Sequence, residues 1–142
     1  MIEPVRRSVH VEVPPDVAFR VFTERLADWW PLATHSGYER DAATVGFVAG
    51  RLVEVSRSGE ENVWGKVTAW EPPGRVVFTW NPNLDKGGDT EVEVRFTANG
   101  AGTNVELEHR AWEALGGRAR RTRENYETGW VPVLDRYVAA AR

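Results

Sequence analysis

The sequence predicts an α+β fold in which a curved antiparallel β-sheet wraps around one long C-terminal α-helix. Two observations support this prediction. The segment 118–141 places large apolar side chains three and four residues apart, which puts them on one stripe of a helix. Most of the chain before it alternates apolar and polar residues, and turns rich in Gly, Pro and Asn separate these stretches. A long amphipathic helix needs a broad apolar surface, and a sheet provides one.

The C-terminal helix is the element around which we expect the chain to be organised. Gly116 and Gly117 mark a break before it. Its predicted apolar stripe consists of Tyr126, Trp130, Leu134, Tyr137 and Val138. Charged residues occupy the positions between them, so this helix should bury one face and expose the other.

The residue pattern of the N-terminal part predicts one strand followed by two short helices. Residues 5–13 alternate, with valines at the odd positions, which indicates a half-buried strand. Pro15 and Asp16 begin a short helix that reaches about Thr23. A second brief helix or turn contains Trp29 and Trp30. Neighbouring tryptophans point in different directions on a helix, so we expect one in the core and the other facing a cleft or solvent.

Five further strands are predicted between Ala43 and Arg110, at hairpin spacing, and they should form an antiparallel meander. Gly50 is a potential break in the first of them, between residues 44–48 and 51–57. The others cover residues 62–71, 75–81, 90–97 and 103–110. Trp64 and Trp80 lie on neighbouring strands at different phases, so alternation alone leaves open which of them faces the interior.

The composition excludes several classes of function. The chain of 142 residues fits one domain, residues 1–142. Lys and Arg number 18 against 21 Asp and Glu, a net charge of −3, which argues against a nucleic-acid partner. No apolar run approaches the ~20 residues of a membrane span, and no signal peptide is visible. With no cysteine, the chain suits a reducing compartment, and we expect a cytoplasmic protein.

Two polar residues interrupt the apolar faces of predicted strands. His109 continues the face of Val105 and Leu107, and Glu54 shares a face with Leu52. If both point inward, they form an acid–base pair, a polar anchor for a ligand, or a structural hydrogen bond. His35 next to Ser36 gives only a weak signal for a nucleophile and its base. Three distant histidines and no cysteine argue against a metal site, and no cofactor is expected.

Aromatic residues are more numerous than a core of this size needs. The chain has 7 Trp, 5 Phe and 3 Tyr. Large planar side chains fill a core, and they also line apolar cavities. This excess favours a binding site for a small apolar molecule.

Several short motifs, in this order, make the chain resemble a known family. They are Trp29-Trp30-Pro31, residues 50–54, 64–67, 70–73, 77–80 and 108–110, and Gly129-Trp130. Together they resemble the START-like (SRPBCC) superfamily, in the branch named for homologues of the activator of the heat-shock-protein-90 ATPase. The resemblance covers residues 5–141. It implies a helix-grip fold with an apolar ligand between the sheet and the last helix, and its members include lipid carriers, hormone receptors and aromatase/cyclases.

Three functions follow as hypotheses. The first is an intracellular binding module that encloses a small lipid-like or aromatic molecule, with Trp30, His35, Glu54, Trp80, His109, Tyr126 and Trp130 as its binding residues. The second is a cyclase or hydrolase in which Glu54 and His109 form the acid–base pair. The third is a protein-interaction role, as a co-chaperone or a homodimer, through exposed tryptophans such as Trp70 or Trp112.

Overall fold

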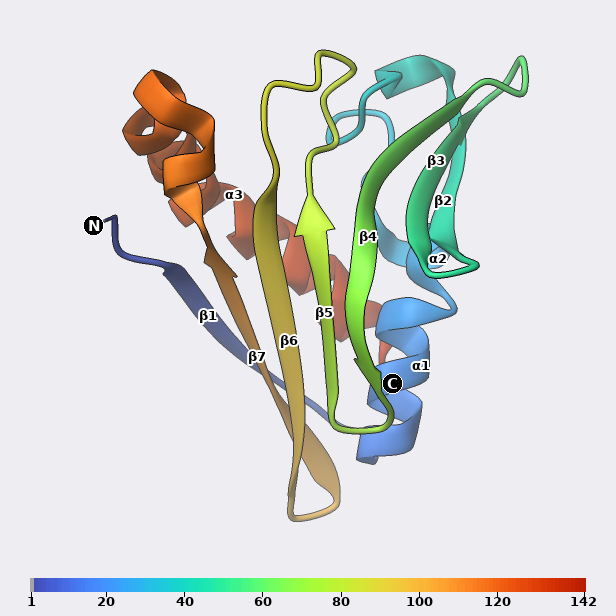
Figure 1. The fold of residues 1–142 in the computed structure, drawn as a ribbon. Coiled ribbons are helices and arrows are strands. Elements are labelled where there is room, and N and C mark those ends of the chain that lie inside the picture. The colour runs from blue at the N-terminus through green and yellow to red at the C-terminus, as the bar shows by residue number, and fades with distance from the viewer. Residues whose placement is uncertain (1) are drawn as a thin grey trace.

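The structure, a computed structural model that describes residues 2–142, is a seven-stranded antiparallel sheet curved around one long helix (Figure 1). The strands are β1 (Val5–Val11), β2 (Ala42–Val48), β3 (Arg51–Ser56), β4 (Glu61–Glu71), β5 (Arg75–Trp80), β6 (Thr90–Asn99) and β7 (Gly102–Arg110). The helices are α1 (Pro15–Thr23), α2 (Leu26–Trp29) and α3 (Ala119–Ala140), with 3₁₀ segments η1 (Glu39–Asp41) and η2 (Trp112–Arg118). The predicted helix-grip α+β fold is confirmed.

The order of strands across the sheet is β1-β7-β6-β5-β4-β3-β2. Strands β2 to β7 therefore form the predicted meander, and β1 adds to its far edge beside β7. The segment with α1 and α2 connects the two edges. The prediction of five strands after α2 was wrong by one. Ala49 and Gly50 adopt left-handed φ angles of 51° and 78°, which reverse the chain and divide the first stretch into β2 and β3.

Helix α3 buries one stripe of side chains, as its spacing predicts. Trp130, Val133, Leu134 and Tyr137 are each no more than 2% exposed. The Tyr137 hydroxyl donates a hydrogen bond to the carbonyl of Ala18 in α1, at 2.8 Å. This contact joins the last helix to the first, so α1 closes one end of the space between helix and sheet.

Trp112 corrects the expectation of an exposed interaction residue. It is fully buried, because the chain after β7 turns inward at Ala111, whose φ is 67°. Its indole Nε1 donates to the carbonyl oxygen of His109 at 3.0 Å. Trp70 is 44% exposed, although its ring also packs edge-on against Phe19. Along residues 2–142, no helix has both the length and the apolar composition needed to cross a membrane.

Candidate functional site

A cleft of about 430 Å³, open to solvent, lies between α3 and two loops. One loop follows α2, and the other follows β5. We call this the aromatic cleft, and its walls are Trp30, Thr34, His35, Ser36, Trp80, Pro82, Asn83, Thr122, Asn125, Tyr126, Gly129, Trp130 and Val133. Its volume is within the usual range for small-molecule sites.

Three tryptophans form the floor of the aromatic cleft. The ring centroids of Trp30, Trp80 and Trp130 lie between 5.5 and 5.9 Å from one another, at tilted or edge-to-face angles. Each indole N–H is already bonded within the protein. Trp30 donates to the carbonyl of His35 at 2.7 Å, Trp80 to the Tyr126 hydroxyl at 2.9 Å, and Trp130 to Nδ1 of His109 at 3.0 Å. Because these three tryptophans are only 2–6% exposed, the floor offers a ligand a small accessible part of their apolar rings and no indole donor.

Polar groups stand at the rim of the aromatic cleft. The Tyr126 hydroxyl accepts the hydrogen bond from Trp80, which leaves its own proton available for donation. Burial raises the pKa of Tyr126, so its phenol stays protonated near neutral pH. His35 is exposed, and its Nδ1 lies 2.7 Å from the Thr34 hydroxyl. A ligand that presents an oxygen acceptor over the floor would meet the phenol of Tyr126.

His109 lies behind the floor and is fully buried. Because Trp130 donates to Nδ1, the imidazole carries its proton on Nε2 and donates to the Thr90 hydroxyl at 2.7 Å. Thr90 in turn donates to the carbonyl of Trp80 at 3.1 Å. Burial lowers the pKa of His109 to about 3. His109 is therefore a weak base, and both of its ring nitrogens are hydrogen-bonded. It is suited to holding Trp130 in place directly and Trp80 through Thr90.

Glu54, in the middle of β3, is fully buried and accepts hydrogen bonds from four donors. These are the backbone N–H groups of Gly37 and Tyr38, Nδ2 of Asn62 and Nε1 of Trp64, at 2.9 to 3.0 Å. Burial alone would raise the pKa of Glu54, but these hydrogen bonds outweigh it and lower the pKa. The carboxylate is therefore ionised at neutral pH.

The structure brings together five of the seven predicted site residues. Trp30, His35, Trp80, Tyr126 and Trp130 line the aromatic cleft. Glu54 and His109 point inward as predicted, but the cleft wall does not include them.

The predicted acid–base pair of Glu54 and His109 is not formed. Within the described residues 2–142, no hydrogen bond or ion pair joins these two side chains, because each is bonded to other neighbours.

The remaining wall residues were not among the site residues predicted from the sequence. Thr122, Asn125, Gly129 and Val133 extend the stripe of Tyr126 and Trp130 at the same helical spacing, so the signal was present in the sequence. Pro82 and Asn83 lie in the loop after β5, where no periodicity marks them.

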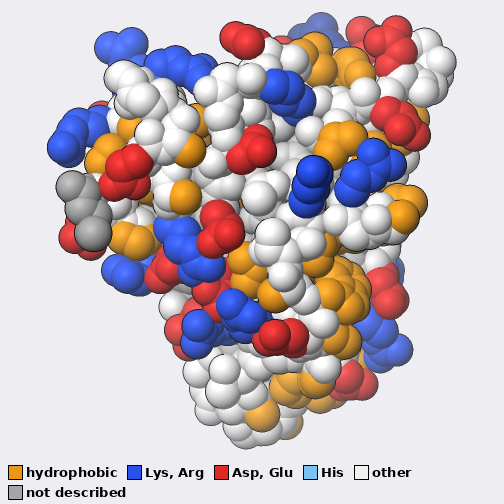
Figure 2. All heavy atoms as spheres, in the orientation of Figure 1, with side chains coloured by type: hydrophobic (Ala, Val, Ile, Leu, Met, Phe, Trp, Pro, Cys, Tyr) orange, Lys and Arg blue, Asp and Glu red, His pale blue; other side chains and the backbone are white. Residues whose placement is uncertain are grey.

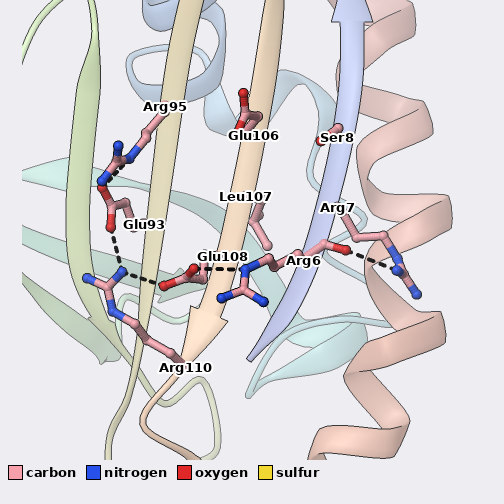
Figure 3. A pocket seen from close by; sticks show the side chains of 9 residues that line it. All are labelled: Arg6, Arg7, Ser8, Glu93, Arg95, Glu106, Leu107, Glu108 and Arg110. Carbon is pink, nitrogen blue, oxygen red and sulfur yellow. Dashed lines mark hydrogen bonds and ion pairs between the residues drawn. The ribbon is translucent and has the colours of Figure 1, made fainter. Parts of the chain in front are cut away.

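A second hollow, of about 370 Å³, lies on the outer face of the sheet over β1, β7 and β6 (Figure 3). Figure 2 shows that acidic and basic side chains are mixed over this face. Glu93 is nearly buried and pairs with Arg75, Arg95 and Arg110. Burial would raise the pKa of Glu93, but these arginines outweigh it and lower the pKa to about 2. Most of the charges here are already paired, which makes this hollow a weaker candidate than the aromatic cleft.

Comparisons with known proteins agree with this fold. A family model described as activator of Hsp90 ATPase homolog 1-like protein matches residues 12–141. A solved anthrahydroquino-γ-pyrone synthase is 34% identical, with a TM-score of 0.64, over 98% of this chain and 97% of that chain. No curated protein matches the chain significantly.

Two further solved structures have lower sequence identity to the chain. CalC from Micromonospora echinospora, described as a self-sacrificing resistance protein, is 27% identical over 96% of this chain and 92% of its own, with a TM-score of 0.70. A protein from Chromobacterium violaceum is 17% identical over 99% and 98% of the two chains, with a TM-score of 0.68. At that identity, the likeness shows the fold alone.

Proposed function

The chain belongs to the START-like (SRPBCC) superfamily, in the family of activator of Hsp90 ATPase homolog 1-like proteins, and on that premise we propose that it binds a small, planar, aromatic molecule in the aromatic cleft. The observation that supports this most is the floor of Trp30, Trp80 and Trp130, which combines apolar ring surface with saturated indole N–H groups. The Tyr126 phenol at its edge favours a ligand that carries a ketone, quinone or phenol oxygen.

Titration with 1,8-dihydroxyanthraquinone tests this proposal. Three tryptophans lie in the floor, so a bound aromatic molecule should quench the intrinsic fluorescence. We expect saturable quenching with one molecule bound per chain, and weaker quenching in Trp80→Leu. Quenching that rises linearly with concentration and is unaffected by this substitution would contradict binding in the cleft.

Tyr126→Phe should weaken binding of the same probe by about two- to tenfold, which is the usual range for one neutral hydrogen bond. The substitution removes the hydroxyl and keeps the ring. Anthracene is the matched control, since it has the same ring system without oxygen, and its affinity should change much less. An equal loss for both probes would show that Tyr126 acts through packing alone. Both affinities are measured by fluorescence titration.

A second candidate is catalysis of a ring closure on such a molecule. The 34% identity to an anthrahydroquino-γ-pyrone synthase favours it. In a γ-pyrone closure, a phenol oxygen adds to the far carbonyl of a 1,3-diketone side chain, and one water is lost. Tyr126 and His35 are the cleft residues able to move protons in such a step. Incubation with a hydroxyanthraquinone that carries a 1,3-diketone, followed by mass spectrometry, would show the loss of one water above the uncatalysed rate.

The protein-interaction hypothesis has less support. The family name mentions the Hsp90 activator, but of the two tryptophans expected at a protein contact, Trp112 is buried and Trp70 is 44% exposed. A chaperone partner, a homodimer and a cytoplasmic location stay predictions.

A further inference from the structure

The hydrogen bonds of Glu54 reach the first of two loops that border the aromatic cleft. Residues 34–36 line the cleft, and we call them the first lip. The next two residues, Gly37 and Tyr38, donate their backbone N–H groups to Oε1 and Oε2 of Glu54, both at 2.9 Å. The end of the first lip is thus fixed to a side chain in the middle of β3.

Asn62 extends the same connection to the other loop. Its Nδ2 donates to Glu54 Oε1 at 3.0 Å and to the carbonyl oxygen of Pro82 at 2.8 Å. Pro82 and Asn83 line the opposite side of the cleft, and we call them the second lip. With both amide protons occupied in this way, Asn62 bridges the carboxylate and the second lip.

The chain is tightly packed at Gly37, the residue directly after the first lip. A Cβ atom there would lie 2.4 Å from Nδ2 of Asn62 and 2.7 Å from the carbonyl oxygen of Pro82. The fourth donor to the carboxylate is Nε1 of Trp64, whose ring packs against Trp30 and Trp80 at centroid distances of 5.4 and 5.3 Å. One carboxylate therefore connects the first lip, the second lip and the ring system of the floor.

We propose that Glu54 is a positioning residue that holds both lips of the aromatic cleft in place, without itself contacting the ligand. This inference deepens the proposed function, on which it rests for the identity of the cleft as a binding site. Burying a charge is unfavourable unless hydrogen bonds compensate it, so the four donors and the carboxylate depend on one another. Removal of the charge releases the two loops together.

Glu54→Gln tests the proposal with almost no change in shape. The amide has a single acceptor oxygen, and its NH₂ group must face donors on one side. Glu93→Gln is the matched control, because Glu93 is also a nearly buried strand carboxylate, but it binds arginines on the outer face of the sheet. Hydrogen exchange of the free proteins, followed by NMR, reads the Gly37 and Tyr38 amides directly.

We expect the protection of at least one of these two amides, the one that faces the NH₂ group of the glutamine, to fall about tenfold or more in Glu54→Gln, as for the loss of one buried hydrogen bond. In Glu93→Gln it should stay within about twofold of the wild type, after correction for global stability. Unchanged protection in Glu54→Gln, or an equal fall in both variants, would overturn the proposal.

Gly37→Ala provides a second variant that leaves the carboxylate intact, in case Glu54→Gln does not fold. The added methyl group pushes the first lip away from Asn62 and Pro82. Gly46→Ala is its control, because a Cβ at Gly46 meets nothing within 4 Å. We expect the backbone amides of the lips to exchange faster in Gly37→Ala than in Gly46→Ala. Equal exchange rates in the two variants would contradict the proposal.

Affinity for 1,8-dihydroxyanthraquinone separates this inference from the proposed function. Glu54→Gln and Gly37→Ala should each weaken binding about fivefold or more, whereas the two controls stay within about twofold. If the wild type does not bind the probe, the proposed function fails and the exchange data alone decide the role of Glu54. If the wild type binds and both lip variants bind equally well, the positioning role is refuted.

Discussion

Trp130→Ala is expected to lower the free energy of unfolding by about 3–5 kcal/mol, the usual range for truncating a large buried aromatic side chain. The Trp130 side chain is 2% exposed and packs against Trp30, Trp80 and Tyr126. Its removal also leaves Nδ1 of the buried His109 without its donor. Urea denaturation at pH 7, followed by circular dichroism, measures the difference.

Val131→Ala is the control for this experiment. Val131 is the next residue of α3 and is 46% exposed, so its truncation should change the free energy of unfolding by less than ~1 kcal/mol. A loss in Trp130→Ala as small as that in Val131→Ala would mean that the Trp130 ring contributes little to the core. The floor of the aromatic cleft would then lack the rigidity on which the proposed function depends.

Acidification below pH 6.5 should destabilise the protein through His109. Burial lowers the pKa of this imidazole from 6.5 to about 3, so the unfolded chain binds its proton at a higher pH than the folded chain. Stability that is present above pH 6.5 is therefore lost as the pH falls toward 3. The slope should reach about 1.4 kcal/mol per pH unit, or about 2–3 kcal/mol between pH 6.5 and 4.5.

The pH range between 6.5 and 4.5 distinguishes the effect of His109 from that of Glu93. Glu93 has its pKa lowered from 4.5 to about 2, so its stabilisation is lost only as the pH falls below 4.5. Urea titrations at pH 7.0, 6.0 and 5.0 should show the slope in the wild type and in His35→Gln, whose side chain is exposed. The slope should disappear in His109→Gln, which is less stable throughout because it disturbs Trp130 and Thr90. A slope that persists in His109→Gln would assign the effect to other groups.

The sequence by itself determined the main elements and the direction of several key side chains. Tyr126, Trp130, Leu134 and Tyr137 repeat at helical spacing, and α3 begins at Ala119, within one residue of the prediction. The alternation in β3 and β7 predicts that Glu54 and His109 share the faces of Leu52 and Leu107, and all four are buried. These features depend on local periodicity, which one stretch of chain contains in full.

Trp64 is a residue whose side-chain direction could not be predicted from the alternation along its strand. Between Leu52 and Val53 of β3 the pairing with β4 shifts, since these residues face Gly65 and Val63. Trp64 is the extra residue of this bulge, and the bulge turns its indole inward toward Glu54. Alternation counted along β4 alone assigns it to the face of Lys66, because a bulge changes the phase without any mark in the sequence.

Only the tertiary structure decided which groups meet at the aromatic cleft. Glu54 and His109 both point inward, and yet Glu54 binds Gly37, Tyr38, Asn62 and Trp64, whereas His109 binds Thr90 and Trp130. These partners come from different strands, from α3 and from a loop without periodic pattern. Their meeting depends on strand register and on the path of that loop, and neither is encoded in the spacing of residues along a single element.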